Sequence, residues 1–421
     1  MSTPGLDRRL GTGDAVVIGL GSMIGAGVFS AIGPAAAAAG SGLLLGLAVA
    51  ALVAYCNAVA SAQLAAQYPV SGGTYVYGRE RLGAWFGFTA GWCFVIGKTA
   101  SCAAMALTFG SYLAPDSAWT SRLLAAAAVV GLTVVTCRGV TRTARLTRVI
   151  VLLTLLVLAV VVGVLTLGAP AGRTGSAGLG SMTDTDPYGV LQSAGLLFFA
   201  FAGYARIATM GEEVRDPEHA IPRAIPLALA ITVAVYAVVA VAALLAVGPE
   251  RLASSAAPLV TAVTSTDVTW AGVLVRVGAA VASLGALLAL MTGIGRTGMA
   301  MARNRDLPGQ LAAVHPRFRV PHRAQITVGA VVTALVLTTD LRGAIGFSSF
   351  GVLLYYAIAN ASALTQDEAH RRWPRALNVL GLVGCLTLVA TLPVSAVLLG
   401  TAVVALGLAG RLVVTRARPV D

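Results

Sequence analysis

Charged side chains are scarce in this chain of 421 residues. Asp, Glu, Lys and Arg together make up 11% of the sequence, whereas hydrophobic residues make up 57%. A water-soluble fold cannot bury so much apolar surface, so the composition excludes a soluble globular protein and favours the lipid bilayer as solvent. Apolar runs recur from residue 14 to residue 413, which leaves no stretch for a separate globular domain. We expect a single all-α membrane domain over residues 1–421.

Acidic and metal-binding side chains are missing from the middle of the apolar runs. Every Asp and Glu lies in a predicted loop or near a predicted helix end, so a proton relay through a buried acid is not expected. The five cysteines contain no CxxC pair, and packing is their ordinary role. We therefore expect no metal, no cofactor and no enzyme activity. The four histidines also lie in predicted loops: His219, His315, His322 and His370.

Length and hydropathy predict twelve membrane-spanning helices, each of about 20 or more mostly apolar residues. The division of the last apolar run into two helices rests on Pro393, which cannot continue a helix without a kink. The predicted ranges are 14–38, 42–66, 84–113, 120–137, 146–168, 189–211, 222–248, 270–300, 325–340, 343–364, 375–392 and 394–413.

The net charge of +12 is a topology signal. With both termini in the cytoplasm, twenty-two of the 29 basic residues fall on the cytoplasmic side and five on the outer side. Short cytoplasmic loops collect Lys and Arg, so this distribution predicts a multi-pass cell-membrane protein with cytoplasmic termini. Lipid is then the partner of the apolar surface, and a nucleic-acid partner is not expected. The five outer residues are Arg122, Arg173, Arg251, Arg276 and Arg342.

Glycines interrupt the first and the sixth predicted helices at corresponding positions. GSMIGAG at 21–27 opens the first interruption, and Gly203 lies among small and aromatic residues in the sixth helix. Broken helices in matching positions of two halves are typical of transporters that bind substrate at mid-membrane. A break frees main-chain N–H groups for a carboxylate and carbonyls for an ammonium group. Glycines in membrane helices also serve close packing, and a dinucleotide fingerprint is excluded because the spacing is one residue too long and no strand precedes it.

Lys98 is the only lysine in the chain and lies near the centre of the third predicted helix. Placing a charge there costs roughly 2.5–3.5 kcal/mol on insertion scales, so a functional role is the default interpretation. We predict a proton-sensitive or cation-mimicking amine. The alternatives are a lysine that reaches an interface or a neutral, packed one. A P-loop would need Gly at position 92, where the chain has Trp92.

Arg206 is the second basic residue inside a predicted helix. A guanidinium keeps its proton, so the side chain needs a carboxylate, helix carbonyls or water. Glu212 and Glu213 follow within two turns and are the candidate partners. We interpret these three residues as a gate or a structural charge group, with direct substrate contact of Arg206 as the alternative.

Four segments resemble the amino acid, polyamine and organocation (APC) transporter superfamily, in particular bacterial permeases similar to cationic amino acid transporters. They are GSMIGAGVFSAIGPAA, YPVSGGTYVYGRERLG, FFAFAGYARIATMGEEVRDPEHAIPRAI and TGMAMARNRDLP, and the similarity covers most of the chain. The resemblance implies the leucine-transporter-like fold of five plus five inverted helices with two appended helices. The first repeat would cover about 14–168, the second about 189–364 and the appended helices about 375–413.

The resemblance also implies where substrate binds. Main-chain groups of the first helix would contact the amino and carboxylate groups of an amino acid, and those of the sixth helix would do the same from the other side. An aromatic at Phe199 or Phe201 would close over the bound molecule. The implied substrate-binding residues are Met23, Ile24, Gly25, Ala26, Gly27, Phe199, Ala200, Phe201, Ala202 and Gly203.

The chain departs from the family pattern at two places. Many proton-coupled relatives carry a lysine in the fifth helix, where this chain has Thr154, and we expect Lys98 to take over that role. Relatives often have an acid after the aromatic of the sixth helix, where this chain has Ala205 followed by Arg206. A pocket near two cationic groups and no acid repels cationic side chains, which favours a neutral amino acid.

These observations predict a secondary active amino acid transporter, driven by a proton or by exchange, that works by alternating access. Sodium coupling ranks lower, because Thr154 and Ser283 do not make up a set of oxygen ligands. The alternatives are an amino-acid-binding receptor or channel-like facilitator, and a transporter of polyamines or other organic cations. A channel would be expected to show charged rings or a filter loop, and none is visible.

Overall fold

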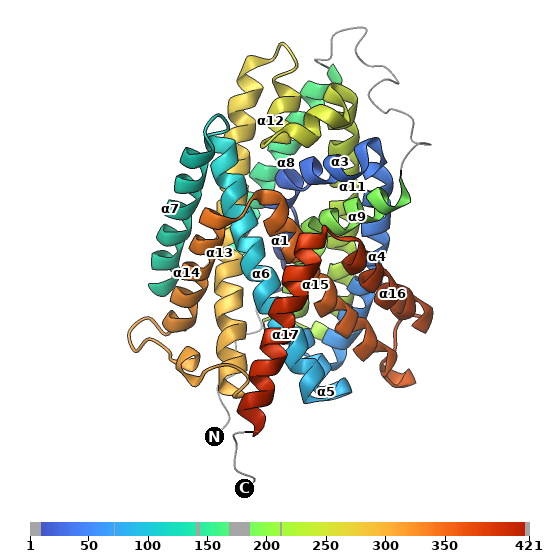
Figure 1. The fold of residues 1–421 in the computed structure, drawn as a ribbon. Helices are drawn as coiled ribbons and strands as arrows, with labels where there is room; N and C mark the ends of the chain where they lie inside the picture. The colour runs from blue at the N-terminus through green and yellow to red at the C-terminus, as the bar shows by residue number, and fades with distance from the viewer. Residues whose placement is uncertain (1–9, 71, 140–143, 168–185, 211–212, 417–421) are drawn as a thin grey trace.

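The computed structural model describes residues 10–70, 72–139, 144–167, 186–210 and 213–416. Within these ranges regular structure is helical, and the sole β-type pairing is an isolated bridge between Leu10 and Val214. Figure 1 shows α6, α1 and α15 in the middle of the bundle, with α7 and α14 on one side and α4 and α16 on the other. The expected all-α architecture is confirmed.

The first half of the chain supplies nine α-helices, and the second half supplies eight. The first set is α1 (Thr12–Met23), α2 (Ala26–Ser30), α3 (Ile32–Ala39), α4 (Leu43–Gln67), α5 (Thr74–Leu82), α6 (Ala84–Leu113), α7 (Ala118–Cys137), α8 (Ala144–Leu167) and α9 (Pro187–Phe201). The second set is α10 (Ala205–Ala208), α11 (Pro217–Ser254), α12 (Pro258–Val263), α13 (Thr269–Arg303), α14 (His322–Thr338), α15 (Leu341–Leu364), α16 (Arg375–Thr391) and α17 (Val394–Arg416). Short 3-10 turns are η1 (Gly40–Gly42), η4 (Ala202–Tyr204), η5 (Gly309–Ala312) and η6 (Glu368–His370).

Ten helical stretches among the described residues are long and apolar enough to cross a membrane. Two shorter apolar helices, α14 and α16, have 17 residues each and correspond to the predicted ninth and eleventh spans. At 1.5 Å per residue such a helix covers about 25 Å, a little less than the hydrocarbon core. A multi-pass helical membrane protein is thus established, while the count of twelve spans and the inverted repeat stay predictions.

The observed ends of several helices differ from the predicted ones. α11 begins at Pro217, five residues earlier than expected, and continues to Ser254 through a kink at Gly248, whose φ is 74°. Proline suits the first turn of a helix because its missing N–H would have no partner there. The last apolar run does divide near Pro393, since α16 ends at Thr391 and α17 begins at Val394. Hydropathy gave no sign of the amphipathic α5.

α6 and α15 cross closely in the centre of the bundle. The crossing lies at Gly97 and Gly351, and a Cβ atom added at Gly351 would lie 2.8 Å from the Cys93 carbonyl oxygen and from the Gly97 Cα. Small residues at such a crossing let two membrane helices approach through their backbones. This contact fixes the third predicted span, which carries Lys98, against the tenth.

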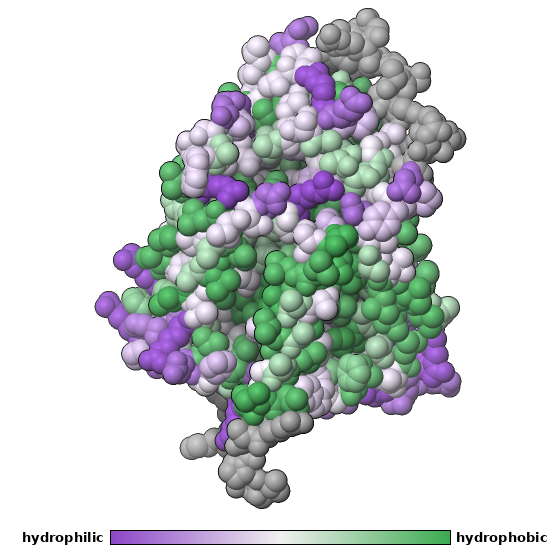
Figure 2. All heavy atoms as spheres, in the orientation of Figure 1, coloured by the Kyte–Doolittle hydropathy of each residue, from purple (hydrophilic) through white to green (hydrophobic). Residues whose placement is uncertain are grey.

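Hydrophobic side chains gather in a band on one face of the molecule, over α15, α16 and α17 (Figure 2). On α17, Leu398, Leu406 and Val413 expose 66%, 71% and 67% of their surface. A patch of this kind would be a liability in water and is expected where lipid tails cover the protein. Basic residues collect at the end where α5 and the last turn of α17 lie, which we call the Arg-rich end. It includes Arg79, Arg81, Arg303, Arg372 and Arg411.

Candidate functional site

The first span is broken at Ile24 and Gly25. α1 ends at Met23, the backbone of Gly25 takes φ −108° and ψ −125°, and α2 starts at Ala26. Gly25 packs directly on α13, where an added Cβ would lie 2.8 Å from the Ala286 Cβ and 3.7 Å from the Ala282 carbonyl oxygen. Glycine allows both the non-helical backbone and the close approach. The sequence pattern GSMIGAG therefore interrupts a helix, as expected.

The sixth span is interrupted at the matching place. α9 ends at Phe201, the chain makes the 3-10 turn η4, and α10 continues for only four residues to Ala208. A change from α-helical to 3-10 hydrogen bonding leaves carbonyl groups without their usual intrahelical partners. The structure shows one of these, the Ala202 carbonyl, accepting hydrogen bonds from two side chains of other helices.

The two interruptions lie against each other. A Cβ added at Gly27 would lie 2.7 Å from the Cα and Cβ of Ala200, and one added at Gly203 would lie 2.3 Å from the Ser22 carbonyl. Both glycines therefore bring the main chains of the two broken helices into contact. All of the residues from Met23 to Gly27 and from Phe199 to Gly203 are buried. The predicted substrate-binding segments thus converge, although nothing in the structure shows what they bind.

Tyr236 on α11 joins the two interruptions and was not among the predicted site residues. Its hydroxyl donates a hydrogen bond to the Met23 carbonyl at 2.6 Å and approaches the Ala200 carbonyl at 3.1 Å. The ring of Tyr236 also packs on Phe201, with 5.2 Å between ring centroids. A tyrosine inside an otherwise apolar helix is a weak signal, because such a side chain also fills interfaces.

Lys98 reaches the interruption of the sixth span from α6. Its Nζ donates a hydrogen bond of 3.0 Å to the Ala202 carbonyl, and the residue is 5% exposed. The Tyr356 hydroxyl of α15 donates to the same carbonyl at 3.3 Å. The lysine therefore does not extend to a membrane interface, and it is placed where a change in its charge would act on the broken helix.

Arg206 and Glu213 lie at the Arg-rich side of this interruption. Their charged groups are 3.8 Å apart, and Arg206 Nη1 lies 3.5 Å from the Thr209 hydroxyl. About a third of each charged side chain is exposed, so water screens the pair and its contribution to stability is small. Glu212, the other predicted partner, lies outside the described residues.

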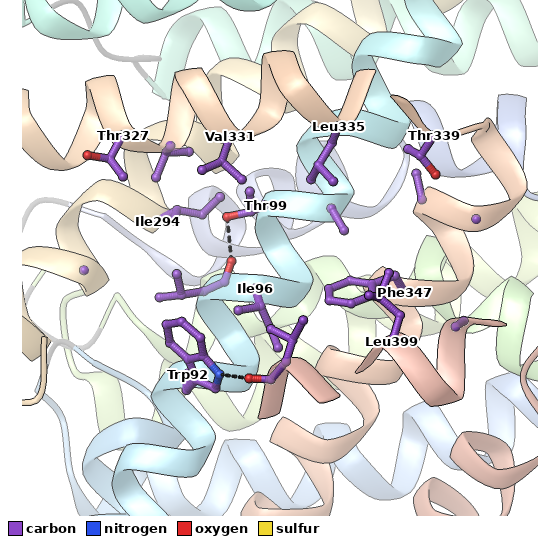
Figure 3. Close-up of a pocket in the computed structure, with 18 of the residues that line it drawn as sticks. Trp92, Ile96, Thr99, Ile294, Thr327, Val331, Leu335, Thr339, Phe347 and Leu399 are labelled. Atoms are coloured by element: carbon purple, nitrogen blue, oxygen red, sulfur yellow. Dashed lines mark hydrogen bonds between the residues drawn. The ribbon is translucent and has the colours of Figure 1, made fainter. Parts of the chain in front are cut away.

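The cavities of the protein do not coincide with the predicted substrate contacts. Next to Gly27, Ala200 and Tyr236 the cavity has a volume of only about 10 Å³, too small for an amino acid. A larger cavity of about 570 Å³ lies between α6, α13, α14, α15 and α17, lined by Trp92, Thr327 and Leu399 among others (Figure 3). Neither this cavity nor one of about 870 Å³ beside Arg411 is lined by a predicted site residue. The interruptions are therefore packed in a closed arrangement.

The two hydroxyl residues considered as cation ligands behave differently. Thr154 on α8 donates its hydroxyl to the Ile150 carbonyl of its own helix at 2.7 Å. The Ser283 hydroxyl on α13 is buried without a hydrogen-bond partner in the described structure. Within the described ranges no group of three or more His, Cys, Asp or Glu side chains lies close enough to hold a metal ion.

Comparison with known proteins extends these observations. A profile described as amino acid permease matches residues 10–410. An uncharacterized transporter of Mycobacterium tuberculosis is 60% identical over 420 residues, covering 99% of this chain and 94% of the relative. A branched-chain amino acid permease of Bacillus subtilis is 24% identical, covering 90% and 84% of the two chains. The chloroplastic cationic amino acid transporter 7 of Arabidopsis thaliana is 29% identical, covering 84% of this chain and 65% of the relative.

The match therefore spans nearly the whole chain, including both interrupted spans. It agrees with the APC resemblance and with the helical membrane architecture. The comparisons point to a transporter rather than an enzyme. This chain belongs to the amino acid permease family.

Proposed function

We propose that this protein is a secondary active transporter that carries a neutral amino acid by alternating access, with the substrate held between the interruptions of the first and sixth spans. The observation that supports this most is the convergence of Gly25–Gly27 with Phe199–Gly203. Freed N–H groups suit a carboxylate and freed carbonyls suit an ammonium group, so two broken helices match a zwitterion. In the closed packing these groups meet each other, and substrate separates them.

The charges around the interruptions favour a neutral side chain in the substrate. Lys98 and Arg206 both lie near the sixth-span interruption, and in the described part of the chain the acid that contacts either one is Glu213. A cationic substrate side chain would meet net positive charge there. Among the relatives, the branched-chain permease is named for neutral substrates and the plant transporters for cationic ones. The local charge decides our choice between the two.

Lys98 is the proposed coupling residue. Its Nζ donates to the Ala202 carbonyl, so loss of its proton would weaken a contact that holds the interrupted helix. Uptake would then depend on pH, through a proton that moves with or against substrate. We also propose that the protein lies in the cell membrane with the Arg-rich end in the cytoplasm, because basic residues collect on that side.

Binding and transport assays test this function. Purified protein is screened by thermal unfolding against all twenty amino acids and common polyamines, since a ligand that binds only the folded state raises the unfolding temperature. Proteoliposomes preloaded with a mixture of unlabelled neutral L-amino acids are then diluted into the radiolabelled mixture. We expect neutral amino acids to stabilise the protein and to be taken up by counterflow.

Three outcomes would overturn the proposal in different ways. Stabilisation without counterflow would indicate a receptor. Uptake that does not saturate and gains nothing from preloading would indicate a channel. Stabilisation and counterflow with L-arginine or a polyamine in place of the neutral mixture would retain the carrier and contradict the substrate class.

A further inference from the structure

Amide side chains are buried along the contact of α4, α15 and α16. Asn57 on α4, Asn360 on α15 and Asn378 on α16 are each 0% exposed, and all three helices are otherwise apolar. The three helices pack on one another. Burying an amide costs free energy unless it is fully hydrogen-bonded, and lipid-facing apolar residues would be cheaper at these positions. The cluster therefore calls for a function.

The amides are partly connected to one another. Asn360 Nδ2 donates to the Asn57 Oδ1 at 2.6 Å and to the Tyr356 carbonyl at 2.9 Å, and the Cys385 thiol donates to the same Asn57 oxygen at 3.3 Å. Gly381 faces this group, and a Cβ there would lie 2.4 Å from the Asn360 Oδ1. The glycine leaves room beside the amide that any larger residue would fill.

Many polar atoms of this region have no hydrogen-bond partner in the described structure. Native proteins pair about 90% or more of their buried polar groups, with ordered water where no protein group is available. Each orphaned atom here is a donor or an acceptor aimed into the helix contact. They are Asn57 Nδ2, Ser61 Oγ, Gln63 Nε2, Asn360 Oδ1, Gln366 Oε1, and Nδ2 and Oδ1 of Asn378.

These residues form a line along the membrane axis. Asn57 and Ser61 are one turn apart on α4, as are Tyr356 and Asn360 on α15, so polar groups recur at steps of about 5 Å. We call the residues Asn57, Ser61, Gln63, Asn360, Gln366 and Asn378 the amide track. The line ends at the Arg-rich end, where the N–H of the exposed Arg372 donates to the Gln63 Oε1 at 3.3 Å. Gln366 Nε2 donates there to the Gln67 Oε1 at 2.7 Å.

The other end of the amide track meets Lys98. Tyr356 donates its hydroxyl to the Ala202 carbonyl that also accepts from Lys98, and its ring stacks on Tyr204 with centroids 4.9 Å apart. The Tyr204 hydroxyl lies beside the side chains of Tyr356 and Asn57. The titratable groups near Lys98 and this junction are Cys102 on α6, Tyr204 on η4, Tyr355 and Tyr356 on α15, and Cys385 on α16.

We propose that the amide track holds a file of water molecules that conducts protons between Lys98 and the aqueous phase at the Arg-rich end. This inference rests on the proposed proton-coupled function. The Lys98 ammonium gives one proton to the adjacent hydroxyl or water, each water passes one proton to the next, and the amine stays neutral until a proton returns. The amide side chains keep their own protons and orient the water. Substrate moves between α2 and η4, so the two paths are separate.

The test separates proton conduction from substrate transport. Asn378→Leu and Gln63→Leu each replace a buried amide of the track by an apolar side chain of similar size. Gln325→Leu on α14 is the matched control, because Gln325 is 2% exposed and its Oε1 is also unpartnered, but it lies outside the track. For each protein, uptake of radiolabelled neutral L-amino acids driven by a pH gradient is measured beside counterflow at equal pH.

We expect the wild type and Gln325→Leu to respond to the gradient. Asn378→Leu and Gln63→Leu should lose at least about tenfold of the gradient-driven rate while counterflow persists, because blocking a proton path removes a 10²–10⁴-fold contribution. Full gradient-driven uptake in both track variants overturns the inference, as does equal loss in Gln325→Leu. Parallel loss of counterflow in both track variants assigns the amides to packing and also overturns it. A wild type without counterflow contradicts the proposed function instead.

Discussion

At the scale of single residues, Gly27 decides how closely the two interrupted spans approach. An added methyl group would lie 2.7 Å from the Cα of Ala200, a backbone atom that cannot swing away. Overpacking of this kind typically costs about 1–3 kcal/mol, and here it would favour separated helices. We predict that Gly27→Ala lowers the rate of neutral amino acid uptake by about tenfold or more. Gly131→Ala on α7 is the control, since nothing lies within 4 Å of its added Cβ.

Uptake by Gly27→Ala at the wild-type rate would show that the contact between the spans has no part in transport. Loss of uptake in both variants would point to general destabilisation. Membrane-inserted amounts of each variant are compared first, because a glycine at a packed crossing also contributes to assembly.

Lys98 carries the predicted pH dependence. Lys98→Met keeps a long apolar stem and removes the amine that donates to the Ala202 carbonyl. We predict that uptake by Lys98→Met no longer changes with pH, while counterflow at equal pH continues. Arg251→Met, at an exposed position of α11, should retain the wild-type pH profile. A Lys98→Met protein with an unchanged profile would exclude this lysine from coupling.

At the scale of elements, Asp306 ties three of them together at the Arg-rich end. Its carboxylate lies 2.7 Å from Nη1 of Arg411 on α17 and 3.5 Å from Nη1 of Arg79 on α5, and it accepts the Tyr75 hydroxyl at 2.8 Å. Asp306 and Arg411 expose only 6% and 8% of their side chains. Burial and the hydrogen bond to Asp306 raise the pKa of Tyr75 to about 12, so the hydroxyl stays a donor at neutral pH.

Replacing this carboxylate should weaken the attachment of α17. Removing one partner of a buried ion pair typically costs about 3–5 kcal/mol, because the remaining charge stays buried. We predict that Asp306→Asn lowers the unfolding temperature clearly. Asp367→Asn, whose side chain is 73% exposed and 3.8 Å from Arg81, should change it little. Equal unfolding temperatures for the wild type and Asp306→Asn would contradict the structural role of this cluster.

The sequence predicted the interruptions because they depend on local residues. Glycine at positions 25 and 27, and at 203, sets what the backbone there can adopt, and that signal is visible without any partner. The partners are a different matter. Tyr236, Tyr356 and Asn57 contact the site from distant helices, and in sequence each is one polar residue in an apolar run. Their meaning depends on helix rotation and packing, which hydropathy does not specify.

Helix ends show the same division. The change of helix near Pro393 follows from the chemistry of proline and was predicted. The early start of α11 at Pro217 was missed, because its first turns carry Glu218 and Arg223 and read as a polar loop. Lys98 was assigned to the core from its position in α6, but only the folded chain shows the carbonyl that it reaches.

At the scale of the whole molecule, the distribution of arginine predicts orientation. Single cysteines at exposed positions of opposite ends test it, because four of the five native cysteines are buried and the fifth, Cys137, is only partly accessible. We predict that an impermeant maleimide labels Ser254→Cys in intact cells and Arg372→Cys only after permeabilisation. The reverse pattern would place the Arg-rich end outside.

A structure of the protein with a bound neutral amino acid tests the central claim most directly. The account predicts that the ligand separates the two interruptions, with its carboxylate at the main-chain N–H groups of residues 26–28 and its ammonium group at carbonyls of residues 199–202. Ligand found instead in the cavity lined by Trp92, Thr327 and Leu399, with the interruptions still packed together, would contradict it.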